Sequence, residues 1–235
     1  MTFKTDDLDV DFMMVYRKAN EILATTSVIE AFPYKIGQLI KEQTDIRLFK
    51  YSKALLKYGI PIEHFGSESA VLMEYEGAYI IFYNDDEKEC RVRFSIGHEL
   101  GHYIFKHKMN LSESDPLYHK QEIEANCFAA QLLMPEQIIR EAIKRGKTPS
   151  IDYIMKAFEV SQKAAEKRKE TLAKYEYEWR KREEKEYDDI IMMRYSSFTD
   201  AIAPKKNKDL YYDYEYEDSR QRERESWLDT RSRYY

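Results

Sequence analysis

Two histidines and a glutamate stand at a spacing that suits metal-assisted hydrolysis. His98 and His102 are four residues apart, and Glu99 directly follows the first of them, in the order His-Glu-x-x-His. On a helix, side chains four apart share one face, so both imidazoles can bind one tetrahedral metal ion. Glu99 lies one step round the helix and can reach a water molecule at the metal, as a general base must. The pattern predicts a zinc site at which water attacks a carbonyl group.

A catalytic zinc site needs a third protein ligand, and the segment from Gln121 to Pro135 offers one. This segment starts with two carboxylates and then turns apolar, so its apolar side can pack against the first helix. Glu122 and Asn126 are one turn apart on one face, which lets Asn126 orient a ligand histidine if Glu122 binds the metal. Glu124 points about half a turn away. We therefore expect Glu122 to be the third ligand, with Glu124 as the alternative.

Longer motifs surround these residues. Residues 91–102 read Arg-x-Arg-Phe-Ser-x-x-His-Glu-Leu-Gly-His, and residues 122–135 read Glu-x-Glu-Ala-Asn-x-Phe-Ala-Ala-x-Leu-Leu-Met-Pro. Together they resemble the ImmA/IrrE family of metallopeptidases, over roughly residues 40–175. The resemblance implies a zinc-dependent peptidase with one Zn²⁺ on His98, His102 and Glu122, and with Glu99 as the catalytic base. It also implies a protein substrate, a helix-turn-helix transcriptional repressor, because such repressors are what these peptidases typically cleave.

The expected architecture is α+β and zincin-like, with helices packed around a small mixed sheet and a helical C-terminal extension. The active-site helix is predicted from about Ser95 to Lys106, after an extended segment from Cys90 to Ser95. The helix that carries Glu122 is predicted from about Lys120 to Leu133.

The remaining elements before the motif are predicted from hydrophobic spacing. Amphipathic helices are expected over residues 9–25 and after Pro33, followed by a strand over residues 46–51 and a short helix to Tyr58. Two β-rich segments, Ala70–Tyr75 and Ala78–Tyr83, flank Glu76-Gly77 and predict a hairpin. We expect the second of them to be an edge strand beside the metal, where an extended substrate could pair with it. A plain hairpin in a small sheet is the alternative.

The loop from Asn110 to Pro116 separates the two metal-binding helices and is expected to flank the cleft. Tyr118 and His119 follow it, and either could stabilise the oxyanion that forms when water attacks the carbonyl. No spacing argument selects one of them. His64 and His107 lie outside the motif, and we interpret both as surface or structurally satisfied residues.

The length and composition predict one substantial core with an extension. The chain has 235 residues, of which 43% are hydrophobic. We divide it into an N-terminal helical segment (1–45), the peptidase core (46–145), C-terminal helices (146–190) and a charged, Tyr-rich tail (191–235). The tail has few aliphatic residues, so we expect it to be disordered or docked. Its tyrosines and arginines suit a contact with a regulatory protein.

Charge and hydropathy limit the possible partners and the compartment. The formal net charge is −5, which gives no bulk attraction to nucleic acid or to an anionic membrane. No segment has the length of a membrane span, and the N-terminus has no signal-peptide pattern, so a cytoplasmic protein is expected. Residues 150–175 resemble a DNA-binding helix pair, but the same pattern is a common packing hairpin. Direct nucleic-acid binding is not expected.

The alternative function is a catalytically silent zinc protein. A zinc-containing sensor that acts through protein contacts would carry the same His-Glu-x-x-His motif. The two hypotheses differ in the role of Glu99, which a peptidase needs as a base and a binding protein does not.

Overall fold

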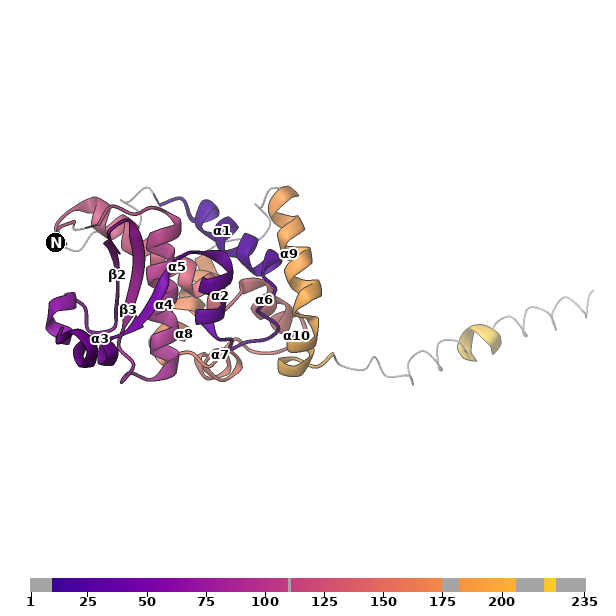
Figure 1. Ribbon diagram of the computed structural model, residues 1–235. Helices are drawn as coiled ribbons and strands as arrows, with labels where there is room; N and C mark the ends of the chain where they lie inside the picture. Colours follow the sequence, from indigo (N-terminus) through magenta and orange to yellow (C-terminus); the bar gives the residue numbers. More distant parts are fainter. Residues whose placement is uncertain (1–9, 110, 175–181, 206–217, 223–235) are drawn as a thin grey trace, which may run out of the picture. The chain divides into compact units, whose positions relative to one another are not determined.

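The computed structural model describes residues 10–109, 111–174, 182–205 and 218–222 (Figure 1). The chain divides into two compact units, Met1–Ala203 and Pro204–Tyr235. The first unit contains both motifs and every helix and strand that positions them. In the second unit, only residues 204–205 and 218–222 are described.

The sheet of the first unit is small and mixed, as expected for the predicted α+β class. Its strands are β1 (Arg47–Lys50), β2 (Ala70–Tyr75) and β3 (Ala78–Tyr83). Their order is β1-β3-β2, with β1 parallel and β2 antiparallel to β3. The hairpin between β2 and β3 turns through Glu76 (φ 51°) and Gly77 (φ 77°), a pair of left-handed residues typical of a type I′ turn. The fold class and this hairpin are confirmed.

The predicted edge strand is wrong. β3 pairs on both sides and is the central strand, whereas β2 is an edge and packs beside the active-site helix. The hydrophobic pattern of a hairpin does not reveal which of its two strands will receive a third. The third strand is β1, which precedes the hairpin in the chain and pairs with β3.

The active-site helix, α4, runs from Glu89 to Ile104 and begins earlier than predicted. The segment Cys90–Ser95, expected to be extended, forms its first turns. The buried residues Arg93, Ile96, Gly97, Leu100 and Gly101 recur every three or four positions, which is the helical period. Arg93 is buried and donates to the Glu159 carbonyl oxygen at 2.5 Å.

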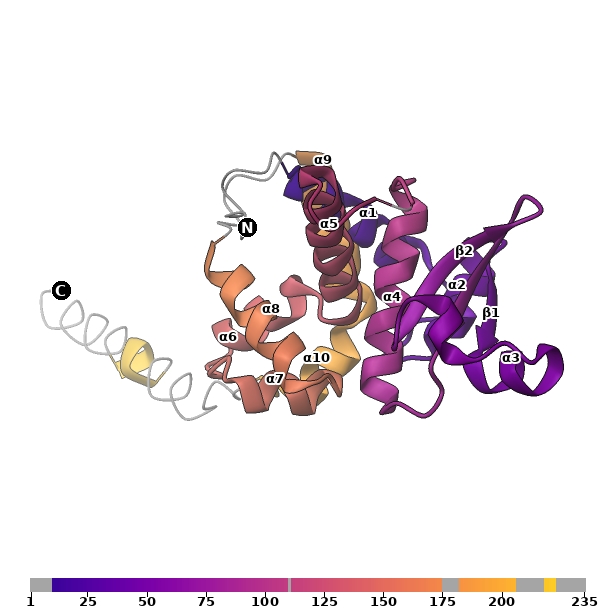
Figure 2. The same cartoon turned by 90° about the vertical axis from the view of Figure 1, so that its left-hand side faces the viewer.

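The ligand helix, α5, runs from Pro116 to Leu133 and also begins earlier than predicted. Asp115 caps it by accepting from the Leu117 nitrogen at 2.8 Å, and Pro116 takes the first helical position. The connection between the two helices covers residues 105–115, so it begins before the predicted loop and ends one residue earlier. In Figure 2, α4 lies between the sheet on one side and α5 on the other, and residue contacts join α4 to both.

The other helices complete the core on either side of this pair. The N-terminal part contains α1 (Phe12–Thr25), α2 (Ile36–Gln43), α3 (Tyr51–Tyr58) and a 3-10 turn (Ile62–Phe65). The C-terminal part contains α6 (Glu136–Lys144), α7 (Ile151–Phe158), α8 (Gln162–Lys174), α9 (Arg182–Arg194) and α10 (Ser196–Ile202). Within the described parts of the chain, no helix is both long and apolar enough to span a bilayer.

Two C-terminal features bear on the sequence predictions. The tail was expected to begin at residue 191, but Ile191 and Tyr195 are fully buried and α9 and α10 belong to the first unit. Residues 206–217 and 223–235 of the predicted tail lie outside the described residues. In the helix pair α7–α8, the Arg168 side chain is 1% exposed and donates to the Tyr16 hydroxyl at 3.1 Å, so it packs against α1.

Candidate metal centre

The arrangement of the candidate metal ligands depends on close packing of α4 against α5. At Gly101, an added Cβ atom would lie 3.1 Å from the Ala125 Cα atom and 3.2 Å from the Phe128 ring. Real Cβ contacts are rarely this short, so the absence of a side chain at Gly101 lets the two helices approach. This approach brings the face of α4 with the two histidines against the first turns of α5.

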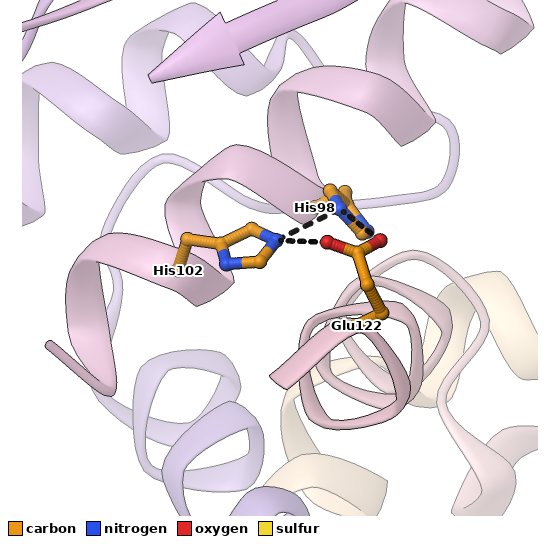
Figure 3. A group of neighbouring side chains, drawn as sticks. All are labelled: His98, His102 and Glu122. Atoms are coloured by element: carbon orange, nitrogen blue, oxygen red, sulfur yellow. Dashed lines mark hydrogen bonds and ion pairs between the residues drawn. The ribbon is translucent and has the colours of Figure 1, made fainter. Parts of the chain in front are cut away.

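Among the described residues, a group that could hold a metal ion consists of His98, His102 and Glu122 (Figure 3). One ligand atom of each lies within 4.8 Å of those of the other two. The His98 and His102 Nε2 atoms are 2.9 Å apart. The Glu122 carboxylate lies 3.4 Å from the His98 Nε2 atom and 3.3 Å from the His102 Nε2 atom. Donor atoms on one tetrahedral zinc are separated by roughly 3.3 Å. These residues therefore fit a zinc ion in donor type, number and spacing, and leave one coordination position open.

The charges at this centre favour cation binding. Burial opposes ionisation of Glu122, but hydrogen bonds from His102 and His98 outweigh it and hold the pKa of this carboxyl well below its usual range. Burial also lowers the pKa of His98, and the hydrogen bond to Glu122 and the nearby Glu99 carboxylate outweigh that effect and raise it. An ionised carboxylate thus stands against two imidazole nitrogens, which suits a divalent cation.

Glu99 points to the sheet side of the centre. Its Oε2 atom accepts a hydrogen bond from the Leu72 backbone nitrogen of β2 at 2.8 Å. Burial raises the pKa of Glu99, although the nearby His98 and His102 lower it in part. A carboxylate with a raised pKa is a better proton acceptor than an ordinary surface glutamate. The contact with β2 places this carboxylate between the ligand histidines and the open edge of the sheet.

Asn126 and His98 are joined by a hydrogen bond whose direction can be assigned. The Asn126 Nδ2 atom donates to the Glu122 carbonyl oxygen at 2.7 Å, so the Oδ1 atom is left to accept. The Oδ1 atom lies 3.2 Å from the His98 Nδ1 atom. With a proton on Nδ1, His98 presents the lone pair of its Nε2 atom to the centre.

Glu124, the alternative third ligand, lies apart from this group and contacts another histidine. Its Oε2 atom is 3.1 Å from the His107 Nε2 atom, and the His107 Nδ1 atom is 2.9 Å from the His102 Nδ1 atom. His107 is thus in direct contact with a residue of the centre, which the sequence pattern did not predict. Its position five residues after His102 gave no helical signal, because His107 lies beyond the end of α4.

Tyr118 and His119 occupy the first turns of α5. Tyr118 is one turn before Glu122 on the same face. Burial and the nearby Glu122 carboxylate raise the pKa of Tyr118, so its hydroxyl stays protonated and can donate. The two rings are 5.5 Å apart. The helical spacing places Tyr118 on the side of α5 that faces the centre.

A cavity of about 640 Å³ opens beside the centre. Its lining includes Asn126, together with Ser95 and Phe94 of α4, Ile123 of α5 and Lys163 of α8. The cavity reaches the side of α5 that carries Asn126, and its lining does not include His98, Glu99, His102 or Glu122. Cys127 also lines it, and burial raises the pKa of this thiol to about 11, so it is a neutral thiol near neutral pH.

One protein family matches this chain. The family is the Peptidase_M78 group, described as the IrrE N-terminal-like domain, and the match covers residues 43–170. These residues include the sheet, α4, α5 and the pair α7–α8 almost to its end. A search of curated proteins finds no matching sequence.

Proposed function

The chain belongs to the Peptidase_M78 family of IrrE N-terminal-like domains, and on this premise we propose that it is a zinc-dependent endopeptidase that cuts a cytoplasmic protein. The observation that carries the proposal is the convergence of His98, His102 and Glu122, with Glu99 beside them. Two imidazoles, a carboxylate and an adjacent base are the protein groups that zinc peptidases use.

Each residue of the centre has a separate role in the proposed hydrolysis. When bound, zinc supplies Lewis acidity, which polarises the scissile carbonyl and lowers the pKa of water. His98, His102 and Glu122 would hold the ion. The Glu99 carboxylate accepts a proton from the attacking water and returns it to the leaving amine. Tyr118 is favoured over His119 as the donor to the oxyanion, because, in addition to burial, the Glu122 carboxylate lies close enough to the Tyr118 hydroxyl to raise its pKa.

The open edge of β2 is the proposed place for the substrate backbone. The Leu72 nitrogen donates to Glu99, while the flanking Ser69 carbonyl oxygen accepts from the Asn84 nitrogen on the β3 side at 2.8 Å. Main-chain groups alternate between the two sides of an antiparallel strand, so those of Ala70, Leu72 and Glu74 point away from β3. An extended peptide that pairs with this edge would pass beside Glu99, as in other cases of strand addition.

The proposed substrate is a helix-turn-helix transcriptional repressor. The membership in a peptidase family and the likeness to ImmA/IrrE proteins support this choice. A peptide bond enters such a site only as an extended strand, so the cut is expected in a flexible loop of the substrate rather than in a helix or sheet.

The experiment compares new protein N-termini in cells that express the wild type, Glu99→Gln or Glu122→Ala, identified by mass spectrometry. Glu113→Gln is the matched control, because it removes an exposed carboxylate from the neighbouring loop. We expect one or a few cut sites that are present with the wild type and the control and absent with both other variants.

Zinc content, measured on the same purified proteins, separates the roles. Glu99→Gln should retain about one zinc per chain, since Glu99 is not a ligand, and Glu122→Ala should lose most of it. If Glu99→Gln produces the same N-termini as the wild type, the peptidase proposal is wrong, and a zinc-containing binding protein becomes the better hypothesis. If Glu122→Ala keeps its zinc, the third ligand is wrong.

A further inference from the structure

We propose that His107 and Glu124 form a hydrogen-bonded chain that orients the ring of His102 and makes it a stronger metal donor. Neither residue would touch the ion. The inference rests on the metal centre of the proposed function but not on peptidase activity. It assigns a positioning role to His107, which lies outside the motif, and to Glu124, which the sequence offered as the alternative third ligand.

When a metal ion occupies the centre, the geometry of the rings sets the direction of each hydrogen bond in this chain. The His102 Nε2 atom faces the His98 Nε2 atom and the Glu122 carboxylate, so the lone pair that binds metal must be on Nε2. A neutral imidazole carries its proton on the other nitrogen, which makes His102 Nδ1 a donor. The His107 Nδ1 atom, at 2.9 Å, must then accept. His107 consequently carries its own proton on Nε2 and donates it to the Glu124 Oε2 atom at 3.1 Å.

The local backbone places His107 where this chain needs it. Lys106 has a φ of 53°, a left-handed conformation that non-glycine residues rarely adopt. The turn folds the backbone back on α4, and the His107 nitrogen donates to the His102 carbonyl oxygen at 3.0 Å. The His107 ring thereby returns to the same turn of α4 that carries His102. Without this reversal, residue 107 would continue away from the centre.

The contact between His107 and Glu124 is protected from water. Their side chains are 5% and 7% exposed, respectively. A buried carboxylate needs hydrogen-bond donors, and His107 supplies one to Glu124, whose other oxygen lies 3.9 Å from the Lys120 ammonium. In a site of low polarity, the negative carboxylate increases the electron density on the His107 ring and, through it, on His102. Carboxylate partners of ligand histidines raise the basicity of the ligand in this way.

The two ligand histidines therefore have different supports: His98 contacts α5 directly through Asn126, whereas His102 reaches Glu124 of α5 through His107. His98 donates to the neutral amide oxygen of Asn126, and His102 donates to a histidine that is backed by a carboxylate. The asymmetry distinguishes the proposal from simple packing. A packing role would depend on the volume of His107 and Glu124, whereas an orienting role depends on their hydrogen bonds in series.

The test measures zinc affinity by competition with a chromophoric chelator, using the purified full chain. The variants are His107→Phe, Glu124→Gln, Glu124→Leu and the double variant His107→Phe/Glu124→Leu. His64→Phe is the matched control, because His64 is an exposed histidine on the 3-10 turn. Thermal unfolding of each metal-free protein separates loss of folding from loss of affinity.

We expect His107→Phe and Glu124→Leu each to weaken zinc binding about 10- to 100-fold. Glu124→Gln should recover part of the loss, since its amide oxygen still accepts from His107. The double variant should bind zinc about as well as His107→Phe alone, because both changes break one chain and their effects are not additive. Zinc affinity of His107→Phe within about twofold of the wild type would overturn the proposal, as would fully additive losses.

The protonation of His107 gives a second readout, by ¹⁵N NMR of the zinc-loaded wild type. The chain requires the proton on the Nε2 atom of His107, and a proton on Nδ1 in its place would overturn the proposal. Neither readout uses peptidase activity. A protein that fulfils both expectations but produces no new N-termini in cells would keep this inference and lose the proposed function.

Discussion

Replacing Gly101 by alanine should loosen the packing of α4 on α5 and weaken the metal centre. An alanine Cβ atom at this position would lie 3.1 Å from the Ala125 Cα atom and 3.4 Å from its Cβ atom. The Ala125 Cα atom belongs to the backbone of α5 and cannot rotate away. The two helices must therefore separate by a few tenths of an ångström, which moves Glu122 away from the two histidines.

Two opposing terms set the size of the effect. Alanine is favoured over glycine inside a helix by about 0.8–1.0 kcal/mol. Overfilling a packed interface costs about 1–3 kcal/mol. We therefore expect Gly101→Ala to lower the free energy of unfolding of the metal-free protein by roughly 0–2 kcal/mol, and to weaken zinc binding as well.

Gly97, one turn earlier on the same helix, provides the matched control. A Cβ atom there would meet the Ile36 Cδ1 atom at 3.4 Å and the Ala129 Cβ atom at 3.5 Å, which are ordinary contacts. Gly97→Ala should keep the helix-propensity gain and stabilise the protein by up to about 1 kcal/mol. The two substitutions are chemically identical and are predicted to have opposite effects.

Urea unfolding of the metal-free proteins and zinc competition would measure both quantities. The expected order of stability is Gly97→Ala, wild type, Gly101→Ala, and only Gly101→Ala should lose zinc affinity. Equal stabilisation by both substitutions, with unchanged zinc affinity, would refute the idea that the close approach at Gly101 positions the ligands.

Three further predictions concern stability. Hydrogen bonds from Ser27 and Thr26 lower the pKa of Glu42 to about 2, so these contacts stabilise the protein above the ordinary pKa of about 4.5 and the stabilisation is lost as the pH falls through about 2. Because Glu42 is exposed, Glu42→Gln should lower the free energy of unfolding by less than about 1 kcal/mol at pH 7. In urea unfolding, the difference in stability between the variant and the wild type should disappear toward pH 2, and a difference that stays constant with pH would contradict the prediction. Phe128→Ala removes a fully buried ring between α4 and α5 and should cost about 3–5 kcal/mol in urea unfolding, and a loss below about 1 kcal/mol would contradict the packing described. Zinc at about 100 times its dissociation constant should stabilise the wild type by about 2.7 kcal/mol, and chelation should reverse the shift in melting temperature, whereas a zinc-independent melting temperature would contradict a native-state site.

The local structure of this chain could largely be predicted from its sequence, because it depends on short-range patterns. The β-rich composition of Ala70–Tyr75 and Ala78–Tyr83 and the turn at Glu76-Gly77 predicted the hairpin with its correct ends. Helix boundaries were less accurate. The predicted loop includes Pro116, which is the first residue of α5, a position that favours proline. The first turns of α4 were predicted to be extended, because Arg93, the first buried residue in their helical pattern, is charged and gives no hydrophobic signal.

The order of the strands could not be predicted from the hairpin alone. β1 lies about 20 residues earlier in the chain, and its parallel pairing with β3 depends on how the intervening helix packs. This pairing makes β2 the edge and places the Leu72 nitrogen against Glu99.

The sequence by itself determined which residue types could bind a metal, because the positions of His98, Glu99 and His102 are related by the period of one helix. Only the tertiary structure decided which residues near this motif contact the metal centre directly and which contact it through another side chain. Glu122 and Glu124 differ by two positions on α5, and the packing angle of α5 on α4 brings one to the centre and the other to His107. The contact of His107 with His102 depends on a backbone reversal at Lys106, which no periodic pattern encodes. Such contacts join separate elements, so their geometry is set by packing rather than by spacing along the chain.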